Sequence, residues 1–261
     1  MGFLLYLRSE CWRTFRQKQM YIFSGACALV ILGLMAMLWA IYQNSTSDVT
    51  EWALYLDVLL DMLAAFLPSA GMFAVMITMD AAFSGEHKYQ TMKNSISFGT
   101  SRLTIYLGKL LTAFLASLFV LAVVIASFLG FGYIFLGVGD GFCFQQSMRM
   151  LGWVLLGALP LWIAALSLMN LLLFAVRSET GAAFAYLGLM TMVGMGLSFL
   201  EVIGYPVFGE IERWLISSQL GSLYGSLGEW AVIWKAWGSG AACAIGFSLF
   251  GYWLFRKMEV R

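Results

Sequence analysis

The side chains of this 261-residue chain that could do chemistry inside an apolar environment are mostly carboxylates. Asp57 and Asp61 are four residues apart, so a helix would present both on one face. Such a pair could attract a cationic substrate into an outer vestibule. More often such a pair is simply solvated at a membrane surface, and the sequence alone leaves both interpretations open.

A second acidic motif raises the question of proteolysis. Residues 137–140 read Gly-Val-Gly-Asp, a G-x-G-D string typical of intramembrane aspartyl proteases. Such enzymes need a second aspartate, so that one carboxyl is protonated while the other is ionised. Asp80 lies at the opposite end of an apolar run, about 30 Å from Asp140 if that run spans a bilayer. We therefore favour a glycine-rich turn with a solvated Asp140 and keep the protease as a remote alternative.

Other catalytic or metal-binding patterns are missing from the sequence. The four cysteines are scattered and His87 is the only histidine, so no spacing typical of a metal site occurs. The phosphate-binding pattern G-x-x-x-x-G-K-[ST] does not occur either, because Gly108-Lys109 is followed by leucine. We expect no enzymatic activity, no metal and no cofactor in this chain.

The elements that must position these residues are long apolar runs. The chain is 61% hydrophobic and 11% charged, against about 25% charged in soluble domains. A bilayer core of about 30 Å takes roughly 20 residues of helix. The sequence predicts an all-α polytopic membrane protein, residues 1–261 forming one domain with six transmembrane helices. The predicted spans are residues 21–42, 58–82, 109–135, 151–176, 181–200 and 231–255.

The basic residues indicate how these spans are oriented. Of the 15 Lys and Arg residues, only Arg149, Arg213 and Lys235 fall outside one set of alternate connections and chain ends. Basic residues collect on the cytosolic side of membrane proteins. We therefore expect a multi-pass protein of a plasma membrane with both termini in the cytosol.

Three segments next to the spans have patterns of their own. Residues 3–18 are amphipathic and predict an N-terminal helix on the inner membrane surface. Residues 201–229 are too apolar for a free outer loop and predict short interfacial or re-entrant helices before the sixth span. In that span Gly238, Ala242 and Gly246 recur every four residues, a ridge typical of close helix packing.

The connection between the second and third spans is the best candidate for a mechanism. Residues 83–108 form a long basic segment where a few residues would join two helices, and long structured loops are usually functional. A short polar helix is predicted at residues 89–96, followed by a break at residues 98–100. We interpret this segment as a cytosolic lever rooted in two membrane helices.

The residues of this segment resemble those of the permease subunits of ABC-2-type ABC transporters. In that family an acid ends the second span, and a threonine, a basic residue, a Ser-Arg pair and a lysine entering the third span follow. The matching residues are Glu86, Thr91, Lys93, Ser101, Arg102 and Lys109. The order of elements is similar over most of the chain, and its length is most like small bacterial permeases of lantibiotic or bacteriocin immunity and drug export. Gly99-Thr100 replaces a proline that is common before the Ser-Arg pair.

The resemblance implies specific partners and roles. The segment between spans two and three would be a coupling helix docking on a cytosolic ABC ATPase, with Glu86, Thr91, Lys93, Arg102 and Lys109 in the coupling region. ATP and magnesium would bind in that separate subunit. Two permease chains, identical or related, would enclose the substrate path.

These observations together predict a function. We expect the permease subunit of an ATP-driven ABC transporter in a bacterial plasma membrane. Its apolar lining favours an amphipathic substrate such as an antimicrobial peptide or hydrophobic drug, and no nucleic acid partner is expected. An ion-coupled secondary transporter and a non-transport membrane scaffold remain alternatives, although the spans contain no mid-membrane carboxylate to relay ions.

Overall fold

A computed structural model describes residues 2–44, 55–83, 96–97, 99–137, 141–176 and 178–257, and this part of the chain contains helices and no strand. Six helical segments are long and apolar enough to cross a membrane. The all-α, six-span prediction is therefore confirmed. The six segments are α2 (Lys18–Asn44), α4 (Leu56–Phe83), α7 (Arg102–Leu136), α8 (Gly141–Val176), the combined α9–η1–α10 (Glu179–Val202) and α13 (Trp230–Lys257).

The third span, α7, begins at Arg102, seven residues before its predicted start at residue 109. Its first turn is stabilised by an N-cap. Gly99 has φ +81°, a left-handed conformation that suits glycine, and its N–H bonds the Ile96 carbonyl at 2.9 Å. The Ser101 hydroxyl then accepts a hydrogen bond from the Thr104 N–H at 3.1 Å and caps α7. The predicted break is thus confirmed at Gly99, and Lys109 lies two turns inside the helix.

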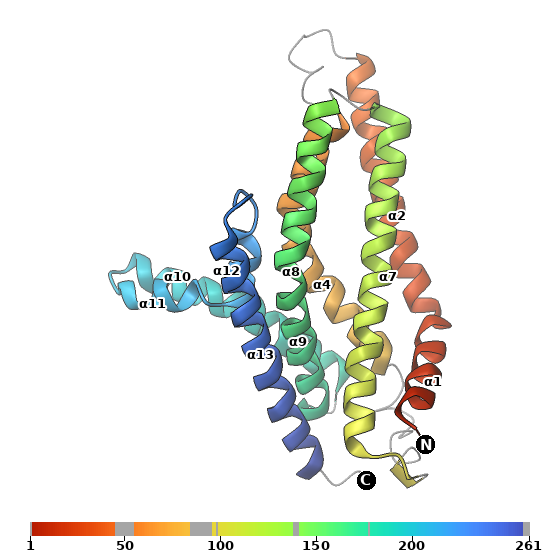
Figure 1. Cartoon of the computed structure of the whole chain (residues 1–261), viewed down its shortest axis with the longest axis vertical. Helices are drawn as coiled ribbons and strands as arrows, with labels where there is room; N and C mark the ends of the chain where they lie inside the picture. Colours follow the sequence, from red (N-terminus) through yellow and green to blue (C-terminus); the bar gives the residue numbers. More distant parts are fainter. Residues whose placement is uncertain are drawn as a thin grey trace.

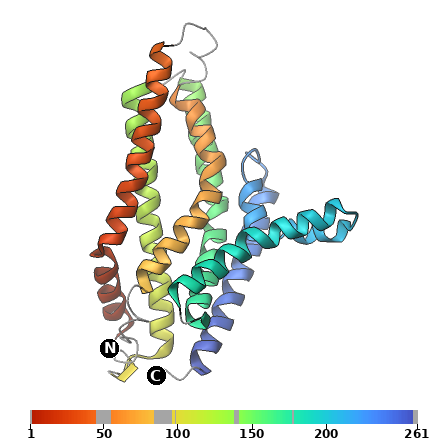
Figure 2. The same cartoon turned by 180° about the vertical axis from the view of Figure 1, so that it is seen from behind.

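The helices are arranged around α8 (Figures 1 and 2). Helix α4 and helix α13 pack along α8, while α2 packs along α7. We call α4 with α8 and α2 with α7 the two helix pairs. The short helix α1 (Phe3–Phe15) lies against α7 near the end of the bundle that holds both chain termini. The two pairs converge at that end, because the lower parts of α4 and α7 pack together.

Two glycines let the helices approach α8 closely. A Cβ on Gly240 of α13 would lie 2.8 Å from the carbonyl carbon of Pro160 in α8. A Cβ on Gly71 of α4 would lie 2.5 Å from the indole of Trp162. That indole N–H donates to the Pro68 carbonyl at 3.0 Å, so the aromatic ring ties α8 to the proline-containing part of α4.

The glycines predicted to form a packing ridge face away from α8. Gly238, Ala242 and Gly246 are exposed, and a Cβ on either glycine would meet nothing within 4 Å. The opposite face of α13 contacts α8, so these three residues lie away from that contact among the described helices. Their role in close helix packing stays a prediction.

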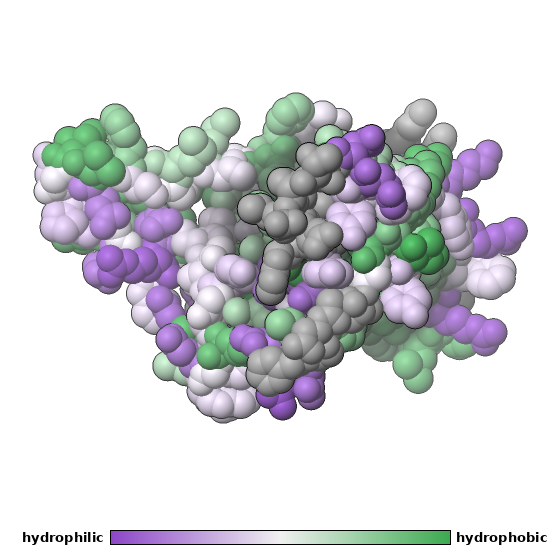
Figure 3. Space-filling model, turned by 90° about the horizontal axis from the view of Figure 1, so that it is seen from above, coloured by the Kyte–Doolittle hydropathy of each residue, from purple (hydrophilic) through white to green (hydrophobic). Residues whose placement is uncertain are grey.

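The fifth apolar segment leaves the bundle as an arm. It comprises α9 (Glu179–Leu187), the π-helical η1 (Gly188–Met192) and α10 (Val193–Val202), and α11 (Pro206–Glu212) folds back on α10. The arm projects sideways in Figure 1, and hydrophobic side chains gather at its outer corner in Figure 3. Helix α12 (Ile216–Ser222) returns to the bundle and buries Leu220 against α4 and α8. The short helices predicted in residues 201–229 are therefore present.

The close contact at Gly240 can be tested by adding one methyl group. We expect Gly240→Ala to lower the free energy of unfolding by about 2 kcal/mol, because the Pro160 backbone cannot yield as a flexible side chain would. Thermal unfolding in mild detergent measures the change. Gly33→Ala on α2 is the control, since its Cβ would meet nothing within 4 Å. Equal stability of the two variants would contradict the α8–α13 packing.

Candidate functional site

A fully buried lysine lies where α1, α4 and α7 meet. Lys109 of α7 has no exposed side-chain surface, and its ammonium needs compensation because an isolated charge is costly in an apolar interior. The Lys109 Nζ donates to Glu10 Oε2 at 2.7 Å and to the Ala82 carbonyl at 2.8 Å. It also lies 5.4 Å from the centre of the Phe83 ring, a cation–π arrangement.

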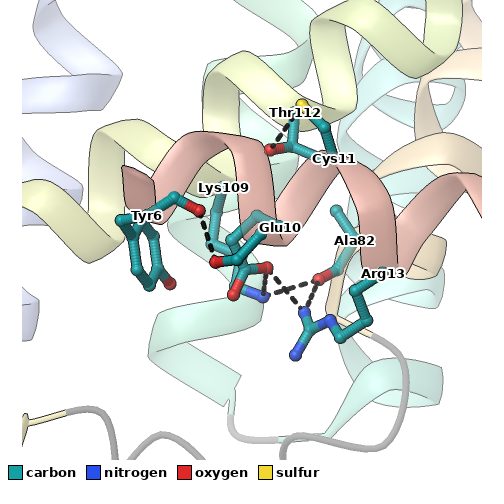
Figure 4. Close-up of polar contacts among 8 residues, drawn as sticks. Tyr6, Glu10, Cys11, Arg13, Ala82, Lys109 and Thr112 are labelled. Carbon is teal, nitrogen blue, oxygen red and sulfur yellow. Dashed lines mark hydrogen bonds and ion pairs between the residues drawn. The ribbon is translucent and has the colours of Figure 1, made fainter. Parts of the chain in front are cut away.

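A second cation completes this cluster, which we call the ionic junction (Figure 4). Arg13 Nη2 donates to the same Glu10 oxygen and the same Ala82 carbonyl, each at 2.8 Å. Ala82 belongs to the last turn of α4, where carbonyl groups carry the partial negative charge of the helix dipole. One carboxylate and one helix C-terminus therefore compensate two cations, and three helices are joined at one point.

The ionic junction changes the interpretation of the N-terminal helix. The sequence pattern places Glu10 and Arg13 on the polar side of α1, away from the membrane. In the structure that polar side faces the bundle, with Glu10 and Thr14 buried, while Leu4 and Trp12 are 77% and 67% exposed. The reason is Lys109, which needs a counter-ion within reach. Leu4 and Trp12 thereby lie on the outer side of α1, whereas Cys11 and Phe15 of the same apolar face pack against α7.

The contact of α1 with α7 is close along its length. A Cβ on Gly108 would lie 2.6 Å from the Tyr6 ring, so the glycine before Lys109 makes room for an aromatic side chain of α1. The Cys11 sulfur and the Thr112 hydroxyl are 3.7 Å apart on the other side of the ionic junction. Helix α1 is thus packed on α7 through residues on both sides of Lys109.

Arg102 makes a second anchor at the beginning of α7. Its Nη1 donates to the carbonyl of Phe255 at 2.8 Å and to that of Arg256 at 2.6 Å, in the last turn of α13. The guanidinium carbon lies 5.7 Å from the centre of the Phe255 ring. A cation at a helix C-terminus is favourable because it meets the unpaired carbonyls there. Arg102 therefore joins α7 to α13 as Lys109 joins α7 to α1 and α4.

Several of the other predicted site residues are not among those that the structure describes. Glu86, Thr91 and Lys93, the G-x-G-D aspartate Asp140 and most of the predicted polar helix lie outside the described residues. Arg102 and Lys109 belong to one helix two turns apart, but each makes bonds within the chain. A role in coupling to an ATPase stays a prediction for all five residues.

The carboxylate pair lies at the far end of α4 from the ionic junction. Asp57 is buried in the first turn of α4, and its Oδ1 has no hydrogen-bond partner among the described residues. Asp61 is half-buried one turn further on. The two acids therefore do not share the fully solvated setting that the pattern also allowed. No group of three or more His, Cys, Asp or Glu side chains suited to a metal occurs among the residues that the structure describes.

Glu10 was the site residue that sequence reasoning missed. Its signal was present: Lys109 stands in an apolar helix and requires an acid, and Glu10 is the only acid before Asp48. The amphipathic pattern of α1 pointed the other way, because a helical wheel cannot tell a face turned to water from a face turned to a buried cation.

The ionic junction predicts non-additive mutations. We expect Glu10→Gln to destabilise the protein by about 3 kcal/mol, because it leaves Lys109 buried without its carboxylate. The double variant Glu10→Gln/Lys109→Met should regain most of that loss, since no uncompensated lysine remains. A double-mutant cycle of unfolding free energies measures both effects. Strictly additive losses would show that the two side chains do not depend on each other.

Comparison with known protein families identifies one family that matches most of the chain. Residues 6–191 match the family model described as ABC-2 family transporter protein, and this span contains most of α1, Lys109, Arg102 and the whole connection between α4 and α7. No curated protein matches the chain. Because the family model covers well over half of the sequence, the chain belongs to the ABC-2 transporter family, whose members are membrane permease subunits that work with ABC ATPases.

Proposed function

We propose that this chain is the permease of a bacterial ABC transporter that exports or expels an amphipathic substrate, such as an antimicrobial peptide or a hydrophobic drug. The family match supports an ABC permease over the ion-coupled transporter, the scaffold and the aspartyl protease that the sequence left open. The preference for an amphipathic substrate rests on the apolar character of the spans, which offer few groups for sugars or ions.

One observation carries the mechanism: both ends of the connection between α4 and α7 are fixed to several helices at once. At the α4 end, the Ala82 carbonyl is held by Lys109 and Arg13. At the α7 end, Arg102 holds the last turn of α13. A force applied to residues 84–95 would therefore reach α1, α4, α7 and α13 together.

The roles of the coupling residues follow from this arrangement. Glu86, Thr91 and Lys93 would contact the ATPase, which holds the ATP and magnesium and supplies the free energy. Lys109 is buried, so its part is to transmit movement from α4 to α1 and α7 rather than to touch the partner. Arg102 would transmit the same movement to α13. Two permease chains would form the path, with Asp57 and Asp61 near its outer end.

The proposed orientation makes Cys143 the outward-facing cysteine. Cys143 is exposed near the start of α8, at the opposite end of the bundle from both termini. We expect a membrane-impermeant maleimide to label intact cells through Cys143, and Cys143→Ser to abolish the labelling. Introducing cysteine at Lys93 in a protein without native cysteines should give no labelling until the membrane is permeabilised. Labelling of that cysteine from outside would reverse the topology.

Docking and transmission can be separated by two alanine variants. We expect Lys93→Ala to reduce the ATPase that co-purifies with the permease about five-fold, as for a lost interaction of about 1 kcal/mol. Arg102→Ala should leave co-purification intact but remove the stimulation of ATP hydrolysis by an active peptide, since α13 is no longer tied to α7.

The control for both variants is Arg149→Ala. Arg149 is exposed at the other end of the bundle, so the same charge is removed far from the coupling segment. Wild-type behaviour of Lys93→Ala and Arg102→Ala in the same assays would refute the coupling role. Purification without any associated ATPase would refute the proposed function itself.

A further inference from the structure

A cavity lies inside the bundle between the two helix pairs. Its volume is about 420 Å³, within the range of small-molecule sites in proteins. The lining comes from α2 and α7 on one side and from α4 and α8 on the other. Cys27, Ala74, Ser117, Val124 and Trp162 are representative lining residues.

The ends of the cavity are closed by contacts between the helix pairs. Toward the chain termini Gln19 of α2 donates to Asp80 of α4 at 3.3 Å, and Met20, Ala81 and Ala116 form a small buried cluster. At the other end Met35 and Leu56 both lie against Gly132 of α7. Between these closures α2 and α4 are separated, which leaves a lateral opening in the middle of the apolar helices.

Among the residues that the structure describes, the lining contains very few polar side chains. The Ser117 hydroxyl donates to the Phe114 carbonyl at 2.8 Å, and the Trp162 indole N–H donates to the Pro68 carbonyl. The Cys27 thiol is the remaining polar side chain, and a thiol is a weak hydrogen-bonding group. Peptide groups or a phosphate placed here would lose their hydrogen bonds to water without replacement.

The length of the cavity indicates which kind of molecule would fill it. Its lining runs from Phe114 to Val124 on α7, which is about 15 Å at 1.5 Å per residue. The hydrocarbon of one leaflet is also about 15 Å thick, half of the ~30 Å bilayer core. An empty cavity would lose dispersion contacts, and water would find no partners in it. We propose that this cavity binds one acyl chain of a membrane phospholipid, which enters between α2 and α4 while its headgroup stays at the membrane surface.

An acyl chain bound in this cavity would have a structural role. Helix α2 packs along α7 but contacts α4 near the two ends of the cavity. Between these contacts the acyl chain would fill the space that separates α2 from α4. The lipid would hold the two helix pairs at a fixed separation, and its departure would let them approach. The site depends on neither an ATPase nor a transported substrate, so it stands independently of the proposed function.

The test is photolabelling of the purified protein in nanodiscs. The probe is a phosphatidylglycerol with a diazirine in the middle of one acyl chain, and residue-level mass spectrometry locates the adducts. We expect adducts on the lining residues Cys27, Ala74 and Val124 as well as on the outward-facing Leu29, which serves as the internal standard. Labelling of Leu29 with none on the lining would overturn the proposal.

A variant whose cavity is filled by a larger side chain provides the matched comparison with the wild-type protein. Ala74→Trp should reduce labelling of the lining at least about five-fold relative to Leu29, since the indole occupies the space of the acyl chain. Ala122→Trp adds the same side chain at an exposed position of α7 outside the cavity and should change nothing. Unchanged lining labels in Ala74→Trp would overturn the assignment. So would labelling of the lining by a diazirine-bearing amphipathic peptide but not by the phospholipid. If Ala74→Trp does not fold, the wild-type adduct pattern still decides the question.

Discussion

The burial of Lys109 is the constraint on which the end of this bundle that holds both chain termini depends. An ammonium without exposed surface requires an anion and further acceptors, and here Glu10 and the Ala82 carbonyl supply them. Because each acceptor belongs to a different helix, satisfying one charge fixes α1 and α4 on α7. Arg13 uses the same two acceptors, which makes the arrangement a network rather than a pair.

The middle of the bundle is held by different forces. Helix α8 packs between α4 and α13 through close backbone approach at Gly71 and Gly240, where dispersion contacts dominate because lipid offers no hydrophobic gain between helices. Among the described residues α2 has little contact with α4, and the cavity lies between these two helices. The bundle is therefore joined by ion pairs and hydrogen bonds at one end and contains a cavity in its middle.

How far the sequence predicts this structure depends on the range of each interaction. The six spans follow from local composition, and the break at Gly99 follows from a residue that accepts positive φ, so both were predictable. The partnership of Glu10 with Lys109 joins residues 99 positions apart, and the helical pattern of α1 is the same whether its polar face meets water or a cation. Likewise the four-residue spacing of Gly238, Ala242 and Gly246 predicts a helix-packing surface but does not determine which helix packs against it. The contact glycine, Gly240, lies on the other face of the same helix.

The two anchors of α7 explain why a permease would place charges inside its own bundle. A purely apolar contact between α7 and its neighbours could slide, because apolar contacts have no preferred direction and each atom pair contributes little. A guanidinium on two carbonyls, or an ammonium on a carboxylate and a carbonyl, has one geometry and a large penalty for any other. Displacing the connection between α4 and α7 therefore cannot be absorbed locally. Under the proposed coupling it would move α1 and α13 as well, and the cavity between α2 and α4 is where the bundle would have room to accommodate that movement.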